Sequence, residues 1–211
     1  MLFKDRHDAA KQLIPALKKY RNTLAVVLAI PRGAVPMGYD VAVALNLPLD
    51  ILLTKKIGHP QNPELAVGAV SLYGRIVDKH YHLDDEYLEK ETQHIRNTLA
   101  ERYKIFMANG NPVDLKNKTA ILIDDGIATG NTILSSVELA RLNGAKRIVV
   151  AVPVASVEAV TKLKPKVDEL ICLHVPDNFM AVGQYYEDFS EVTDENVIRI
   201  LRKQQPDKSK I

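Results

Sequence analysis

The chain has little cysteine, little excess charge and no long apolar run. Cys172 is the single cysteine among 211 residues, which excludes an intrachain disulfide and weakly favours a reducing compartment. It lies in the apolar run 170–173, which indicates a buried strand residue rather than a nucleophile. No apolar stretch approaches ~18 residues and no signal-type segment follows Met1, so we expect no membrane contact and a cytoplasmic protein.

Two further absences narrow the classes of ligand. No two glycines stand two residues apart, which excludes a Rossmann G-x-G motif. Gly130 is followed by Asn131 rather than by the lysine of a Walker A loop. A net charge of +2 is too small to indicate a nucleic-acid-binding protein, so no nucleic-acid partner is expected. The mild excess of Lys and Arg is compatible with a small anionic substrate.

Apolar, β-branched runs alternate with helical patterns along the chain. Strands are expected at 24–30, 49–53, 119–123, 147–154 and 169–173, with helices at 35–45, 132–143 and 156–163. Because the apolar runs are continuous, they predict parallel strands covered on both faces, as in a doubly wound, mainly parallel α/β sheet. A further helix is expected over 8–20, with a kink or a late start at Pro15.

Residues 65–110 are expected to form an excursion from this sheet. Two short extended runs, 65–72 and 75–77, predict a hairpin, and 84–107 predicts one long amphipathic helix. The excursion has too few apolar residues for a core of its own, so we expect a single domain over 1–211. The segment 54–64, with its Gly, Pro and Asn, is expected to be a mobile loop, and 203–211 a frayed tail.

Residues 121–132, with the sequence ILIDDGIATGNT, carry the most information about function. Three apolar residues end a buried strand, Asp124 and Asp125 follow at its tip, and a Gly-containing loop leads into a helix. Ligands of open α/β sheets bind just outside the carboxyl ends of the strands, and a helix N-terminus offers free N–H groups to a phosphate. This combination suits a phosphorylated sugar. The competing interpretation is an Asp-Asp-Gly turn that only caps a helix.

This segment resembles the signature of the type I phosphoribosyltransferases, enzymes and regulators that bind phosphoribosyl pyrophosphate (PRPP). The resemblance implies that Asp124 and Asp125 hold the ribose hydroxyls. It also implies that a loop wraps the 5′-phosphate, and that this loop consists of Ala128, Thr129, Gly130, Asn131 and Thr132. The pattern of the whole chain is most similar to a group of bacterial phosphoribosyltransferases whose acceptor base is not settled.

The resemblance also makes two other loops candidates for binding pyrophosphate. Pro31, Arg32 and Gly33 follow the first strand, where the family holds its pyrophosphate loop, and the bond between Pro31 and Arg32 is expected to be cis. The guanidinium of Arg32 suits phosphate oxygens, although a plain turn with a solvated Arg32 is the alternative. Lys55 and Lys56, in the segment after the second strand, become candidates for pyrophosphate contacts, as does His59. A solvated basic loop is the alternative there.

Residues 174–195 are similar to the hood of purine phosphoribosyltransferases. In that hood a Pro-Asp-x-Phe turn supplies a ring that stacks on the base, and Phe179 matches the ring. The alternative is that Phe179 packs on the edge of the sheet, and packing is favoured for Tyr186 and Phe189. Ala128 stands where hypoxanthine-guanine enzymes have an Asp, and 151–154 contains no lysine for a 6-oxo group, so the acceptor base is left open.

The expected function is Mg²⁺-dependent transfer of the 5-phosphoribosyl group from PRPP to a nucleobase-like acceptor. The candidate catalytic residues are Asp124, Asp125, Arg32, Lys55 and Lys56. Mg²⁺ is expected to be held through PRPP and water, with no direct ligand from the protein, and the resemblance implies a homodimer. One alternative is a non-catalytic PRPP-binding regulator or sensor. Another is a PRPP-binding partner of a different enzyme, with the helix over 84–107 as the contact surface.

Overall fold

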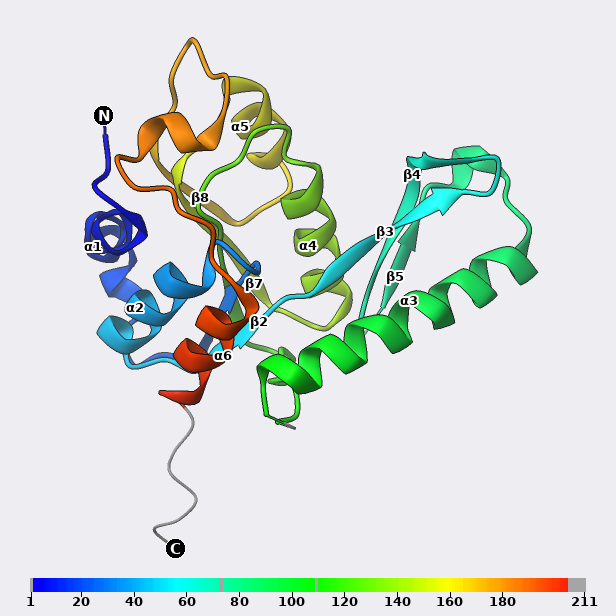
Figure 1. Cartoon of the computed structure of the whole chain (residues 1–211), viewed down its shortest axis with the longest axis horizontal. Helices are drawn as coiled ribbons and strands as arrows, with labels where there is room; N and C mark the ends of the chain where they lie inside the picture. The colour runs from blue at the N-terminus through cyan, green and yellow to red at the C-terminus, as the bar shows by residue number, and fades with distance from the viewer. Residues whose placement is uncertain (1, 73, 109, 205–211) are drawn as a thin grey trace, which may run out of the picture.

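A computed structural model describes residues 2–72, 74–108 and 110–204, and its centre is a parallel sheet of five strands (Figure 1). The strand order is β2-β1-β6-β7-β8, and every neighbouring pair is parallel. The strands are β1 (Ala25–Ala29), β2 (Leu49–Ile51), β6 (Thr119–Ile123), β7 (Arg147–Val154) and β8 (Glu169–His174). The doubly wound α/β fold predicted from the continuous apolar runs is confirmed.

Helices cover both faces of this sheet. Successive strand residues point to opposite faces, so Val27 and Ala29 belong to one core while Val26 and Leu28 belong to the other. The first core also contains side chains of α1 (Arg6–Leu17) and α2 (Val35–Leu45). The second contains side chains of α4 (Asn131–Leu142) and α5 (Val157–Leu163). Asp5 caps α1 by accepting a bond from the Asp8 N–H at 2.8 Å, so of the two alternatives predicted at Pro15, a kink or a late start, the late start does not occur.

The excursion stands to one side of the parallel sheet (Figure 1). It is an antiparallel sheet of β3 (Thr54–His59), β4 (Asn62–Ser71) and β5 (Arg75–Val77), followed by η2 (Lys79–Tyr81) and the long helix α3 (Asp85–Phe106). The predicted hairpin and long helix are confirmed. The mobile loop predicted over 54–64 is wrong, because these residues pair in β3 and β4. Composition did not reveal the pairing, since the partner strand supplies the hydrogen bonds.

The C-terminal part returns over the ends of the parallel strands. After β8 the chain forms the short helix η3 (Val182–Tyr185) and then α6 (Asp194–Arg202), which the sequence reasoning missed. The N-terminal residues pair with this return: the Phe3 N–H bonds the Tyr185 carbonyl at 2.7 Å, and the Glu187 N–H bonds the Phe3 carbonyl at 2.8 Å. Phe3 is fully buried. We call residues 2–6, which join the hood in this way, the N-terminal strap.

Several smaller predictions can be checked. η1 (Lys18–Tyr20) continues α1, and Leu13, Leu17 and Tyr20 are buried. Cys172 lies in β8 but is only half-buried, with its Sγ 3.2 Å from the His174 carbonyl oxygen. Of the tail predicted to fray, Gln204 donates to the Leu47 carbonyl at 3.1 Å, and 205–211 lie outside the described residues.

Candidate active site

Two loops meet at the carboxyl ends of adjacent parallel strands. β1 and β6 are neighbours in register, with Ala29 opposite Ile123. Beyond them, the Ile30 N–H bonds the Ile123 carbonyl at 3.1 Å, so the chain after β1 stays beside the chain after β6. The loop carrying Arg32 therefore lies against the loop carrying Asp124 and Asp125. This is the edge of an open α/β sheet at which ligands bind.

Each acid of the pair uses one oxygen within the protein. Oδ1 of Asp124 accepts the backbone N–H of Asp125 at 2.9 Å, and Oδ2 of Asp125 accepts from Nε of Arg6 at 3.0 Å. Among the described residues, the second oxygen of each carboxylate has no hydrogen-bond partner. The Tyr186 hydroxyl donates to the Asp125 backbone carbonyl at 2.6 Å, which fixes the main chain at this point. Two acceptor oxygens are left for a ligand.

Burial dominates the electrostatics of this pair. The pKa of Asp124 is raised well above its usual value, first by burial and then by repulsion from Asp125. Burial also raises the pKa of Asp125, while the charge and the hydrogen bond of Arg6 act in the opposite direction. The pKa of the Tyr186 hydroxyl is raised by burial, so this group stays a neutral donor. The pair is costly to ionise, which is common at functional sites.

The loop after β1 approaches the acids very closely. The peptide bond between Pro31 and Arg32 is cis, as expected. A Cβ atom at Gly33 would lie 2.1 Å from Oδ2 of Asp125, so only glycine leaves room for that carboxylate. Arg32 is 38% exposed and forms ion pairs with Glu191 and, at 3.5 Å, with Asp194. Its guanidinium is already held by acids when no phosphate is bound.

The loop after the acids ends at an uncapped helix. Gly130 is the N-cap of α4 with φ +80°, a left-handed conformation that favours glycine, and no side chain caps the helix. Ala128, Thr129, Asn131 and Thr132 are exposed around it. The Ser156 hydroxyl holds the Ala128 carbonyl, and the Ile127 N–H bonds Val154 of β7 at 3.0 Å. The first N–H groups of α4 are therefore open to an anion.

A hollow of about 410 Å³ brings part of the predicted site together, within the size range of small-molecule sites. Its lining includes Asp125, Arg32 and Gly33, together with residues from the N-terminal strap and from the hood: Arg6, Phe189, Glu191 and Val192. Lys55 and Lys56 do not line it. Both lie on exposed positions of β3, where Nζ of Lys56 is 2.9 Å from a carboxylate oxygen of Glu64.

Phe179 is part of an aromatic group in the hood. Its ring stacks on Tyr185 with centroids 5.7 Å apart and planes 22° from parallel. Tyr185 in turn meets His174 edge-on at 5.5 Å. Phe179 is half-buried, while its neighbour Met180 is 80% exposed. One face of the Phe179 ring is therefore used by the protein, as the packing alternative anticipates, and the stack forms a rigid aromatic surface at the hood.

Comparison with known proteins gives the family. The model of the phosphoribosyl transferase domain matches residues 2–190, which is nearly the whole chain. The chain belongs to the phosphoribosyl transferase domain family. The resemblance inferred from the acidic pair and its phosphate loop is thus confirmed.

Two relatives extend over most of this phosphoribosyl transferase domain. The protein TT1426 from Thermus thermophilus is 40% identical with a TM-score of 0.86, and the match covers 96% of this chain and 99% of that one. A Mycobacterium tuberculosis protein named provisionally as a phosphoribosyl transferase is 37% identical over 95% of this chain and 46% of its own length. The chain thus spans about half the length of the curated relatives it matches. A Neisseria gonorrhoeae protein, 12% identical over 97% and 99% of the two chains, has a TM-score of 0.52 and shows the fold alone.

The candidate site contains residues that local sequence patterns did not predict to be there. Arg6 comes from the first turn of α1 and Tyr186 from the hood, yet both bond Asp125. A polar residue just after an N-cap carries no signal of its own, because its partner is 119 residues away. Within the described ranges, no group of three His, Cys, Asp or Glu side chains is arranged to hold a metal ion, and no helix is long and apolar enough to cross a membrane.

Proposed function

We propose that the chain transfers the 5-phosphoribosyl group of PRPP to a nucleobase-like acceptor and releases pyrophosphate. The observation that carries this proposal is the placement of two acids, each with one open oxygen, between an uncapped helix N-terminus and an arginine loop. Hydroxyl acceptors, phosphate donors and a cation are the groups that a phosphorylated, pyrophosphorylated ribose requires.

In this proposal Asp124 and Asp125 accept hydrogen bonds from the ribose hydroxyls through their open oxygens. The 5′-phosphate binds the loop and helix start formed by Ala128, Thr129, Gly130, Asn131 and Thr132. The ribose is then fixed at both ends, which sets C1 in one position for reaction. The buried charge of the acid pair lies beside the ring on which positive charge develops as the bond to pyrophosphate breaks.

Pyrophosphate is assigned to the loop of Pro31, Arg32 and Gly33. Its oxygens would replace the carboxylates of Glu191 and Asp194 as the partners of the Arg32 guanidinium. This exchange frees two acids that border the site. Lys55 and Lys56 remain candidates only if β3 and β4 move toward the hollow, since neither lysine lines it.

The residues present fit Mg²⁺ bound through its substrate. Carboxylate and hydroxyl oxygens are the donors that this ion prefers, and it retains several waters and phosphate oxygens. With two open carboxylate oxygens in the pair, the chain would hold Mg²⁺ indirectly, by orienting the ribose hydroxyls. When bound, the ion neutralises charge on the departing pyrophosphate.

The bond changes are simple. The bond from ribose C1 to the pyrophosphate oxygen breaks with its electron pair on oxygen, and an acceptor nitrogen forms a bond to C1 and loses its proton. An aromatic hood that includes Phe179 is suited to a flat heterocycle. We leave the heterocycle unnamed, because Ala128 and residues 151–154 of β7 offer no polar side chain to read a 6-oxo group.

The test is pyrophosphate release from PRPP and Mg²⁺ with each of adenine, hypoxanthine, guanine, xanthine, uracil and orotate. Asp125→Ala should abolish base-dependent release, and Asp85→Ala, an exposed acid on α3, is the matched control. Full activity of Asp125→Ala would contradict the assignment of the site. Absence of PRPP binding by the unaltered chain would contradict the proposed function.

A regulator or sensor that binds PRPP without catalysis is the second candidate. The missing residues for a 6-oxo group, at Ala128 and in 151–154, favour it, because a regulator needs no acceptor base. Binding of PRPP in the absence of release with any of the six bases would support this candidate. Transfer to any base would exclude it. A homodimer, expected from the family resemblance, is checked by mass measurement in solution.

A further inference from the structure

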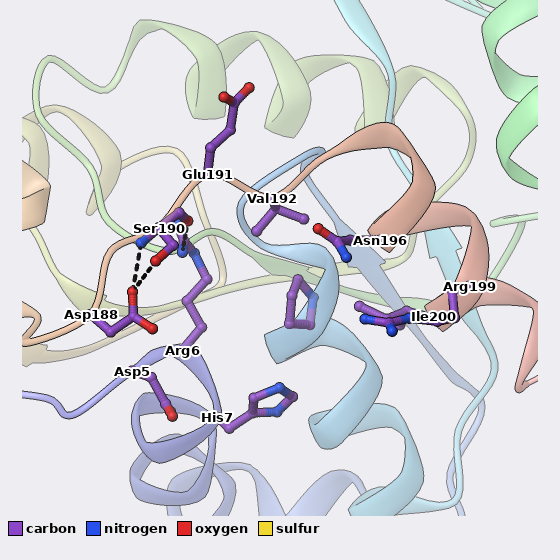
Figure 2. Close-up of a pocket in the computed structure, with 11 residues that line it drawn as sticks. Asp5, Arg6, His7, Asp188, Ser190, Glu191, Val192, Asn196, Arg199 and Ile200 are labelled. Atoms are coloured by element: carbon purple, nitrogen blue, oxygen red, sulfur yellow. Dashed lines mark hydrogen bonds between the residues drawn. The ribbon is translucent and has the colours of Figure 1, made fainter.

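Arg6 connects three parts of the chain at the edge of the site. It lies in the first turn of α1, and only 9% of it is exposed. Its Nε donates to Oδ2 of Asp125 at 3.0 Å, and its Nη1 donates to the Ser190 carbonyl at 2.8 Å. The guanidinium carbon lies 4.1 Å from the centre of the Phe189 ring. Figure 2 shows the side chain reaching from α1 toward Ser190.

The contact to Asp125 decides which oxygen of that carboxylate is already used by the protein. Oδ2 is bound by Arg6 and is also the atom that a Cβ at Gly33 would strike. Oδ1 is thereby the oxygen left for a ligand. A side chain whose one oxygen is held by a buried guanidinium has little freedom to rotate. Arg6 therefore restricts the Asp125 carboxylate to one orientation, in which Oδ1 is the oxygen left open.

The other two contacts connect the acid to the C-terminal half of the hood. Ser190 and Phe189 follow directly on the stretch that pairs with the N-terminal strap, where the Asp188 N–H bonds the Lys4 carbonyl at 2.9 Å. Tyr186, from the same stretch, bonds the main chain of Asp125. The position of the acid and the position of this stretch are therefore set by one network rather than by two separate ones.

We propose that Arg6 is a positioning residue of the ribose site, holding Asp125 so that its open oxygen faces the sugar and coupling that orientation to residues 186–190 of the C-terminal return. This inference rests on the proposed function, since it assigns ribose to Asp125. It adds a residue that no family motif in the chain contains, drawn from the opposite end of the sequence. Arg6 acts through Asp125 and need not touch the substrate.

The variants separate this role from a merely structural one. Arg6→Gln removes the positive charge. Arg6→Lys keeps a positive charge, but its single ammonium group can reach only one of the two acceptors, Asp125 or the Ser190 carbonyl, that the guanidinium contacts together. Arg141→Gln is the matched control, because Arg141 also pairs with an aspartate, Asp168, at 2.8 Å on the protein surface. Binding of PRPP alone is measured by titration calorimetry, and thermal unfolding is recorded for every variant.

Arg6→Gln should weaken PRPP binding by about 10- to 100-fold, the loss that follows a small misplacement of a binding group. Arg6→Lys should recover part of that loss, and Arg141→Gln should bind normally. In an Asp125→Asn background, Arg6→Gln should add little further loss, because the two residues act as a unit.

Two outcomes would overturn the inference. In one, the Arg6→Gln variant unfolds at a lower temperature but binds PRPP with unchanged affinity. In the other, Arg6→Gln lowers PRPP affinity by the same factor in the unaltered protein and in the Asp125→Asn background. If the unaltered chain does not bind PRPP, the proposed function fails and this inference fails with it. Binding by the unaltered chain together with either of the first two results overturns the inference alone.

Discussion

Asp124 is held in the folded protein at an electrostatic cost. Its pKa in the folded state is raised above the ordinary value of 3.8 by burial and by Asp125. A carboxyl whose pKa rises on folding makes its full contribution to folding stability at pH values below its unfolded pKa. This contribution is lost as the pH rises through the folded pKa. Above the ordinary pKa of an aspartate, Asp124 therefore lowers the stability of the folded protein, a cost that a site adapted to ligand binding accepts.

Asp124→Asn should accordingly stabilise the chain at neutral pH. The expected gain is about 1 kcal/mol in the free energy of unfolding, of the size typical for relief of strain at a functional site. The asparagine oxygen can still accept the Asp125 N–H, so the turn is retained. Urea unfolding at pH 7 and near pH 4 checks the prediction, because the gain should shrink toward the acid end. A gain of equal size at both pH values would contradict it.

Gly33→Ala should damage ligand binding much more than stability. The new methyl group would lie 2.1 Å from Oδ2 of Asp125 and must displace that carboxylate. We expect PRPP affinity or turnover to fall about 100-fold, the effect of a displacement near 1 Å. Gly74→Ala is the control, since its Cβ would meet no heavy atom closer than 3.8 Å. Comparable losses in the two variants would show that the close approach at Gly33 is unimportant.

The buried strands of the parallel sheet were predictable from local sequence, whereas the exposed strand β3 and the helix α6 were not. The strands over 119–123 and 147–154 were predicted with the bounds that they have, because a continuous β-branched run has one favourable place, the inside of a parallel sheet. β3 was missed because its exposed lysines and its Gly58 lack that pattern, and its stability comes from pairing with β4. α6 was missed because its two buried side chains, Val197 and Leu201, are few among charges.

Asp50 joins the excursion to the parallel sheet. This carboxyl on β2 is only 2% exposed, and it accepts from the Tyr103 hydroxyl of α3 at 2.8 Å and from the Val113 N–H at 2.7 Å. Asp50→Ala should lower the free energy of unfolding by about 3 kcal/mol, because buried donors lose their acceptor. Asp50→Asn should lose less, since burial raises the pKa of Asp50 and so already favours the neutral acid. Chemical denaturation measures both changes. An unchanged free energy of unfolding in Asp50→Ala would contradict the role of Asp50 in joining the excursion to the parallel sheet.

At the scale of the whole molecule, the chain has one large core on each face of the parallel sheet and a thinner excursion beside it. The three-stranded sheet has α3 against one face and meets α4 across a groove lined by residues such as Val67, Val77 and Leu134. That it forms one domain with the rest stays a prediction. The contacts that complete the site join distant segments, such as Arg6 to Asp125, and no local pattern encodes them.

The excursion should open more readily than the parallel sheet. Its strands β3 and β5 are mostly exposed or half-buried, whereas β1 and β7 are almost wholly buried. Local opening follows such differences in buried apolar contact. Amide hydrogen exchange should therefore be clearly faster in β3–β5 than in β1, β6 and β7. Equal protection in the two sheets would show that they open only together.

The pairing of the N-terminal strap with the hood also affects when the site can form during synthesis. Arg6 and the Ser190 carbonyl that it bonds are separated by 184 positions. At the usual pace of translation, the strap leaves the ribosome roughly 10 to 40 s before that partner does. During this interval the parallel sheet can begin to form, but the acidic pair lacks the contacts that orient it. The acidic pair thus acquires these orienting contacts only after residue 190 has been synthesised.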